Sequence, residues 1–137
     1  MTGLKLNQNQ FSDLVNLNNK VFYPLVNFVN KKDFETIIKK SLLNKKFFPY
    51  PIFFGINKKN YNKFKNKKEI FFFYKSKIIA KVNNINFFQI NKKEFGYKIY
   101  GKNYKRHPYY KKFKSENYRF INFDIKKIYK FKLDKSL

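Results

Sequence analysis

The residues of this chain that could do chemistry are few and widely separated. His107 is the only histidine, cysteine is absent, and the eight carboxylates are scattered without a paired spacing. General acid–base catalysis needs a positioned group with a tuned pKa, and a zinc site needs several histidine or cysteine ligands. The four glycines stand too far apart for a phosphate-binding loop. We therefore expect no catalytic residue, metal site or cofactor, and we expect His107 to be a turn residue that hydrogen-bonds to the backbone.

The best candidate for a binding surface is a cluster of basic and tyrosine residues between Asn103 and Phe113, together with the lysine just before it. Basic side chains neutralise phosphates, and tyrosine rings stack on bases. In the alternative interpretation the tyrosines pack on the sheet and the lysines simply face water. The candidate nucleic-acid-binding residues are Lys102, Tyr104, Lys105, Arg106, Tyr109, Tyr110, Lys111 and Lys112.

A net charge of +24 also favours a polyanionic partner such as RNA. However, the cations are 30 lysines against 2 arginines, and Asn, Ile, Phe and Tyr are abundant as well. An A/T-rich genome produces this composition without selection for binding, whereas a surface selected for phosphate contacts usually favours the bidentate guanidinium of arginine. Compositional drift therefore explains most of the charge, although the domain must still bind polyanions loosely and in a salt-dependent way.

The first half of the chain predicts two capped helices and then an extended segment. Phe11, Leu14 and Val15 share one helical face, and we expect Asn9 to cap this helix. Asn30 is the expected cap of a second helix, whose buried stripe is Phe34, Ile37, Ile38 and Leu42. Prolines at 49 and 51 precede a strand predicted at 52–56.

Residues 57–68 are rich in lysine and asparagine, and we expect a basic loop there. The functional interpretation is an arm that follows phosphates, with Tyr61 and Phe64 as stacking residues. The simpler interpretation, which we favour, is a solvated insertion between strands.

The second half of the chain predicts mainly strands. Residues 69–74 and 77–82 form a hairpin around Lys75-Ser76, and the apolar run 70–73 implies a strand covered on both faces, as in a small closed barrel. Further strands are expected at 87–90, 118–121 and 125–131. A third helix at 92–100 is expected to begin at Asn91 and to end before Gly101.

Several short segments resemble the N-terminal PUA-like domain of ATP sulfurylase (sulfate adenylyltransferase). The order and spacing agree from about residue 4 to about residue 127. The sequence departs at Lys20-Val21, at Asn27 and at Tyr109, where the family has glycine. The matching residues are Ser12-Asp13-Leu14, Asn19, Phe22, Pro24, Leu25, Phe28, Asp33-Phe34, Pro49, Pro51, Ile52, Tyr100-Gly101 and His107-Pro108.

The resemblance implies an α+β fold, a PUA-like small mixed β-barrel with short flanking helices. It also implies that chemistry belongs to a second domain, which in ATP sulfurylases holds ATP with a Gln-x-Arg-Asn-Pro segment and a His-x-x-His-like segment. Neither segment occurs here, and the chain ends close to where the PUA-like domain would give way to the catalytic one. We therefore expect no enzyme activity from this polypeptide on its own.

We interpret residues 1–137 as a single domain with a frayed tail at 132–137. The start of the chain lacks a signal pattern, and no apolar run is long enough to span a membrane. A soluble, cytoplasmic protein with no membrane partner is expected.

Three functions remain open. The first is a free-standing binding module for RNA or another polyanion, since the PUA-like fold is used elsewhere for RNA. The second is an accessory domain of a sulfate-activating system that acts with a separately encoded sulfurylase catalytic chain. The third, ranked behind these, is a remnant without a present biochemical role.

Overall fold

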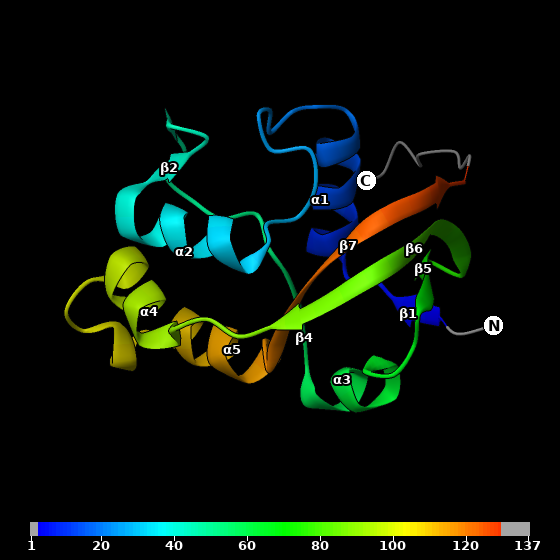
Figure 1. Ribbon diagram of the computed structural model, residues 1–137. Coiled ribbons are helices and arrows are strands. Elements are labelled where there is room, and N and C mark those ends of the chain that lie inside the picture. Colours follow the sequence, from blue (N-terminus) through cyan, green and yellow to red (C-terminus); the bar gives the residue numbers. More distant parts are fainter. Residues whose placement is uncertain (1–2, 130–137) are drawn as a thin grey trace.

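The computed structural model describes residues 3–129, in which short helices flank a curled sheet (Figure 1). The strands are β1 (Gly3–Lys5), β2 (Leu42–Leu43), β3 (Lys46–Phe47), β4 (Phe54–Ile56), β5 (Glu69–Tyr74), β6 (Lys77–Phe88) and β7 (Arg119–Ile128). The helices are α1 (Gln8–Asn18), α2 (Lys31–Lys40), α3 (Lys58–Phe64), α4 (Lys92–Tyr100) and α5 (Pro108–Glu116), with the 3-10 turn η1 (Tyr104–Arg106).

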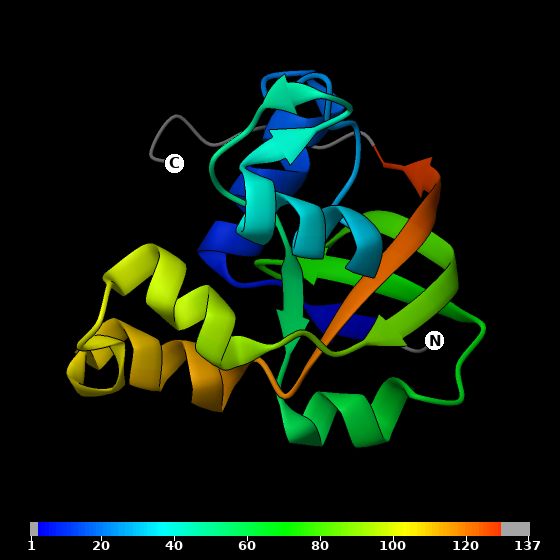
Figure 2. The same cartoon turned by 60° about the vertical axis from the view of Figure 1, so that its left-hand side comes forward.

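The main sheet has the strand order β1-β5-β6-β7-β4, and only β1 runs parallel to its neighbour. The long strand β6 pairs with β5 on one side and with β7 on the other, and the register of these pairs shifts at three points. Such shifts bend a strand and increase its twist, so the sheet curls into a half-barrel (Figure 2). The predicted α+β fold, a PUA-like small mixed β-barrel with short flanking helices, is confirmed, but the sheet is open between its edge strands β1 and β4 and is not the closed barrel that the apolar run 70–73 implied.

Both hairpin turns use residues with positive φ. Lys75 and Ser76 have φ values of 48° and 66°, as a two-residue turn between twisted antiparallel strands requires, so the predicted hairpin β5–β6 is confirmed. A second hairpin, β2–β3, turns at Asn44 and Lys45 with φ values of 49° and 66°. The strands of this second hairpin are only two residues long, too short for an alternating pattern, so the hairpin was not predicted from the sequence.

Asparagine side chains begin the first four helices. The Oδ1 atoms of Asn30 and Asn91 accept hydrogen bonds from backbone N–H groups inside α2 and α4, at 2.8 Å and 3.1 Å, as predicted. For α1 the predicted cap was wrong. Asn7 rather than Asn9 begins the helix, because its side chain accepts from Gln10 N at 2.8 Å while Gln10 Oε1 accepts from Asn7 N at 3.0 Å. This reciprocal pair satisfies two donors of the first turn.

The loop predicted at 57–68 is half helix. Asn57 begins α3 by accepting a hydrogen bond from Asn60 N at 2.8 Å, and Phe64 is almost fully buried at its end. Tyr61, one turn earlier, packs edge to face on Phe87 at 5.4 Å. Only two apolar residues mark the inner face of α3, which was too few to reveal a helical period among the lysines. Neither ring is free to stack as part of a mobile arm.

Three strand predictions also need correction. The strand expected at 87–90 is the end of β6, and the two strands expected after residue 117 are one strand, β7. In β5, Ile70 and Phe72 are buried whereas Phe71 and Phe73 are half-buried, so only one face is fully covered. Polar residues in the sequence suggest a break, but a bulge in the pairing of β6 with β7 accommodates the irregularity, and the strand continues through it. The predicted tail at 132–137 and the last residues of the strand expected at 125–131 lie outside the described residues.

Phenylalanine rings form the core between the sheet and the helices. Phe34 of α2 has no exposed surface and contacts Phe53, Phe95 and Phe120 at ring-centroid distances of 5.5, 6.1 and 5.1 Å. A neighbouring set, seated on the inner face of the half-barrel, consists of Phe28, Phe54, Phe72 and Phe123. Edge-to-face and stacked ring pairs, both of which occur here, add to the free energy gained by burial alone.

Replacing Phe34 with alanine is expected to lower the free energy of unfolding by about 3 to 5 kcal/mol, because it leaves a cavity among four other rings. Urea unfolding followed by circular dichroism measures the change. Phe47→Ala is the matched control, since the Phe47 ring is 76% exposed. Equal losses in the two variants would contradict the assignment of the core.

Candidate nucleic-acid interface

The predicted basic cluster folds as η1 and α5, which lie beside α4 at one end of the sheet (Figure 2). His107 begins α5, because its Nδ1 accepts a hydrogen bond from Tyr109 N at 3.3 Å and Pro108 follows at the first helical position. Its ring stacks on Tyr100 of α4 at 4.4 Å. The predicted role of His107 as a turn residue bonded to the backbone is confirmed.

Helix α5 is held in place by Tyr110 and Phe113, which are 5% and 7% exposed. Gly96 of α4 permits this packing, since a Cβ there would lie 2.6 Å from the rings of both Tyr104 and Tyr110. Burial, and then the neighbouring Tyr104, raises the pKa of Tyr110. A buried ring cannot stack on a base, so the stacking role predicted for Tyr110 is wrong.

Helix α5 itself was not predicted from the sequence. Its signals were the His-Pro pair, which suits a helix start, and the spacing of Tyr110 and Phe113, which puts both rings on one helical face. The helix matters because its period places neighbouring residues, Lys111 and Lys112, on opposite sides of α5.

On one side of α5 lies a hollow of about 670 Å³, which we call the basic hollow. It lies between α5 and the start of α4, and none of its lining residues is acidic. They are Gln89, Ile90, Asn91, Lys92, Lys93, Lys105, Tyr110, Lys111 and Lys114.

The charges around the basic hollow repel one another. Burial lowers the pKa of Lys92, and the positive charges of Arg119 and Lys114 lower it further. An anion placed among these ammonium groups relieves their repulsion. The arrangement can hold phosphate groups through charge, but it offers no group suited to acid–base chemistry.

On the other side of α5 lies a polar cleft of about 710 Å³, bounded also by α1 and by the segment that enters β4. Tyr109 and Lys112 face it from α5, and Asp13 and Tyr50 face it from the other two walls. Burial raises the pKa of Asp13 from 3.8 to about 6. Burial also raises the pKa of Tyr50 to about 12, with smaller contributions from Tyr100 and from the Asp13 carboxylate.

Comparison with protein-family models shows which family has this arrangement of sheet and helices. A family model described as PUA-like domain matches residues 1–129. The chain belongs to the PUA-like domain family. Comparison with proteins of curated function found no match.

The basic cluster predicted from sequence is divided by the fold of this PUA-like domain. Lys105, Tyr110 and Lys111 line the basic hollow, whereas Tyr109 and Lys112 line the polar cleft. Lys102 and Arg106 are exposed outside both, and Tyr104 is half-buried with its ring centroid 4.9 Å from that of Tyr110. The alternative interpretation, in which tyrosines pack and lysines face water, describes Tyr104 and Tyr110 but not Tyr109, which is 66% exposed.

Three lysines of the basic hollow were missed in the sequence analysis. Lys92 and Lys93 come from the first turn of α4, so that nearly the whole of this helix separates them from the cluster, and Lys114 comes after the cluster. Only the packing of α4 against α5 brings them together, so no local pattern could have found them.

No helix within residues 3–129 is both long enough and apolar enough to cross a membrane. In the same residues, no three His, Asp or Glu side chains gather where they could hold a metal ion.

The variant Asp13→Asn is expected to be more stable than the parent at about pH 7.5 and equally stable below about pH 3.5. The folded-state pKa is raised above 3.8, so the ionised carboxylate destabilises the folded state. The loss of stability caused by the ionised carboxylate is absent at low pH, increases between about pH 4 and about pH 6, and stays constant at higher pH. Urea unfolding at both pH values measures the difference, and a variant less stable at the higher pH would contradict the expected sign.

Proposed function

We propose that this PUA-like domain is a binding module, not an enzyme on its own, and that it takes single-stranded RNA or another polyanion along α5. The observation that carries the proposal is the basic hollow, where five lysines from α4, η1 and α5 surround a space that no carboxylate lines. Lysines neutralise phosphates as point charges, and this neutralisation supplies most of the affinity of non-specific nucleic-acid binding.

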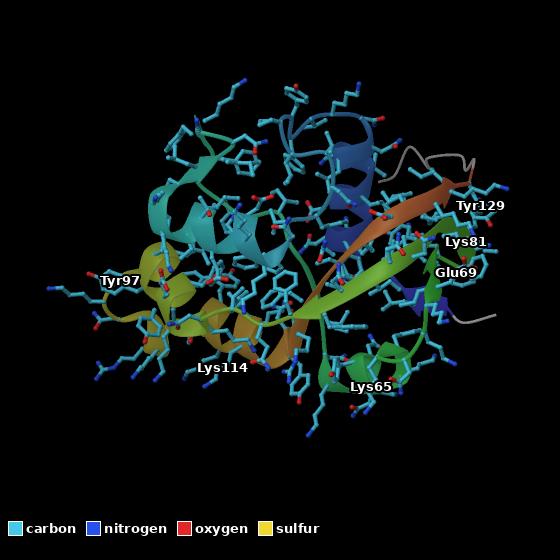
Figure 3. The ribbon with its side chains drawn as sticks, in the orientation of Figure 1. Lys65, Glu69, Lys81, Tyr97, Lys114 and Tyr129 are labelled. Atoms are coloured by element: carbon cyan, nitrogen blue, oxygen red, sulfur yellow. The ribbon has the colours of Figure 1, made fainter. Side chains whose placement is uncertain are left out.

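Several lysines elsewhere in the chain lie next to acids, unlike those of the basic hollow. On α2, Lys31, Lys32, Lys39 and Lys40 surround Glu35. At the far end of the sheet from Lys114, Glu69 pairs with Lys81 at 3.0 Å (Figure 3) and with Lys126 at 3.3 Å. Compositional drift spreads lysine over the whole surface, but it does not by itself keep acids out of one hollow.

Exposed Tyr109 supports the choice of a nucleic acid over a simple anion. Its ring is 66% exposed at the start of α5, beside His107 at a ring-centroid distance of 5.5 Å. Base–aromatic stacking is tolerant of sequence, and together with a basic groove it is how many proteins hold single strands.

Changing Lys105, Lys111 and Lys114 together to glutamine is expected to weaken binding of a uridine oligonucleotide and to reduce its salt dependence. Loss of three phosphate contacts lowers the slope of log K against log salt by about 2, because each contact on a single strand contributes about 0.7. Fluorescence anisotropy over a series of salt concentrations measures both quantities.

The matched control is the triple change of Lys39, Lys40 and Lys46 to glutamine. These exposed lysines lie at the end of α2 and in the β2–β3 hairpin, away from α5 (Figure 1), and the control removes the same charge. Equal weakening in the two triple variants would reduce the interaction to general attraction and would overturn the assignment to α5.

A second candidate function rests on the resemblance to ATP sulfurylase. Two segments that carry the resemblance, Tyr100-Gly101 and His107-Pro108, pack together, with Tyr100 stacked on His107 at 4.4 Å. This contact favours a retained sulfurylase-like local structure. In this alternative the chain is an accessory domain of a sulfate-activating system and works beside a separate catalytic chain.

The isolated chain is expected to release no pyrophosphate from ATP and sulfate, because the nucleotide-binding segments of ATP sulfurylase are missing from its sequence. A coupled pyrophosphate assay checks this, with a complete ATP sulfurylase as the positive control. A clear signal from the isolated chain would contradict the non-catalytic assignment. Adjacent genes for a sulfurylase catalytic chain or an adenylylsulfate kinase would favour the accessory function over RNA binding.

A further inference from the structure

The polar cleft has an aromatic side. Tyr50, Tyr100 and Tyr109 all line it, and the rings of Tyr50 and Tyr109 are 43% and 66% exposed. His107 links two of them, since its ring stacks on Tyr100 and lies 5.5 Å from that of Tyr109. A flat ligand that enters the cleft therefore meets ring surfaces from α5, from the end of α4 and from the segment before β4.

Most amide side chains that line the polar cleft are already used by the fold. Asn7 and Gln10 bond to each other's backbone, and Gln10 Nε2 also donates to Gly55 O at 3.1 Å. Asn57 caps α3, and Asn117 Nδ2 donates to Phe113 O at 2.8 Å. These groups shape the cleft but have little hydrogen-bonding capacity left for a ligand.

Two carboxylates line the cleft, Asp13 and Glu116, and of these Glu116 pairs with Lys112 at 3.9 Å. Within residues 3–129 the Asp13 carboxylate accepts no hydrogen bond and forms no ion pair, although the chain carries 30 lysines. The carboxylate is half-buried in α1 and lies close enough to Tyr50 for its charge to act on that phenol. An unpaired, partly desolvated carboxylate is costly for the fold, and a ligand with two adjacent donors would satisfy it.

We propose that the polar cleft binds one guanine base of a single-stranded RNA, with Asp13 accepting hydrogen bonds from the base's N1–H and N2–H₂ groups and with the cleft tyrosines stacking on the ring. This inference rests on the proposed function, because it assigns base selectivity to the RNA that α5 binds. Lys112 faces the same cleft, and its exposed ammonium, 3.9 Å from Glu116, would contact the phosphate of that nucleotide.

The chemistry of the four bases selects guanine. A carboxylate only accepts hydrogen bonds, and it has two oxygens side by side. Guanine is the base whose Watson–Crick edge presents two neighbouring donors, whereas adenine, cytosine and uracil each present a single donor group beside at least one acceptor. Proteins read unstacked RNA bases through this edge while aromatic side chains stack on the ring. The three other bases would each leave an acceptor facing the negative charge of Asp13.

The experiment compares heptamers that are uridine throughout except at the central position, which carries guanine, inosine, adenine or uracil. The parent protein is expected to bind the guanine heptamer about 10-fold more tightly than the uracil or adenine heptamers, the lower range for a bidentate contact to a base. Inosine lacks the N2 amine and should fall between them. In Asp13→Asn this preference is expected to disappear.

Asp33→Asn is the matched control because it raises the net charge by the same amount on α2, outside the cleft. It is expected to retain the guanine preference. If the parent binds all four heptamers equally, or if Asp13→Asn keeps the preference, the guanine site is wrong while RNA binding by α5 stands. If no heptamer binds at any salt concentration, the proposed function and the guanine site are both wrong.

Discussion

The structure depends on phenylalanine rings that pack against one another, some edge to face and some stacked, between the curled sheet and the helices around it. Phe34, Phe53 and Phe120 are central to this set, because each contacts rings from several elements. Such a core has few small residues to fill gaps, since Ala80 is the only alanine in the chain. Close packing must therefore come from the angles between large rings, which fixes where each helix can lie.

The candidate interface follows from that packing. Phe113 of α5 stacks on Phe95 of α4 at 4.2 Å, and Gly96 next to it lets Tyr110 approach. Once the apolar face of α5 is fixed, the helical period sends Lys111 and Lys112 to different sides. The basic hollow and the polar cleft are thus two consequences of one buried helical face.

The sequence predicted the elements that local signals specify. Helix caps at Asn30 and Asn91 and the hairpin at Lys75-Ser76 follow from short-range chemistry and are confirmed. Where an apolar face is short, as in α3 and α5, the pattern was hidden by lysine and asparagine, so both helices were missed.

The candidate site was less predictable for a physical reason. Its charged members were visible in the sequence as a cluster, but the fold divided that cluster between two sides of α5. Lys92 joins the basic hollow, and Asp13 joins the polar cleft, only through contacts between elements distant in the chain. The family was predictable from spaced segments, since a PUA-like model matches residues 1–129. The particular link to ATP sulfurylase stays a prediction.

The asparagines that begin α1, α2, α3 and α4 determine how the starts of these helices respond to low pH. Aspartate often serves at such positions, and it loses its charge-assisted bond when it takes up a proton. An amide has no proton to gain in this range, so these four helix starts keep their bonds unchanged from neutral to strongly acidic solution. Protonation of a capping carboxylate, one common way in which acid destabilises helices, therefore does not occur at these four helix starts.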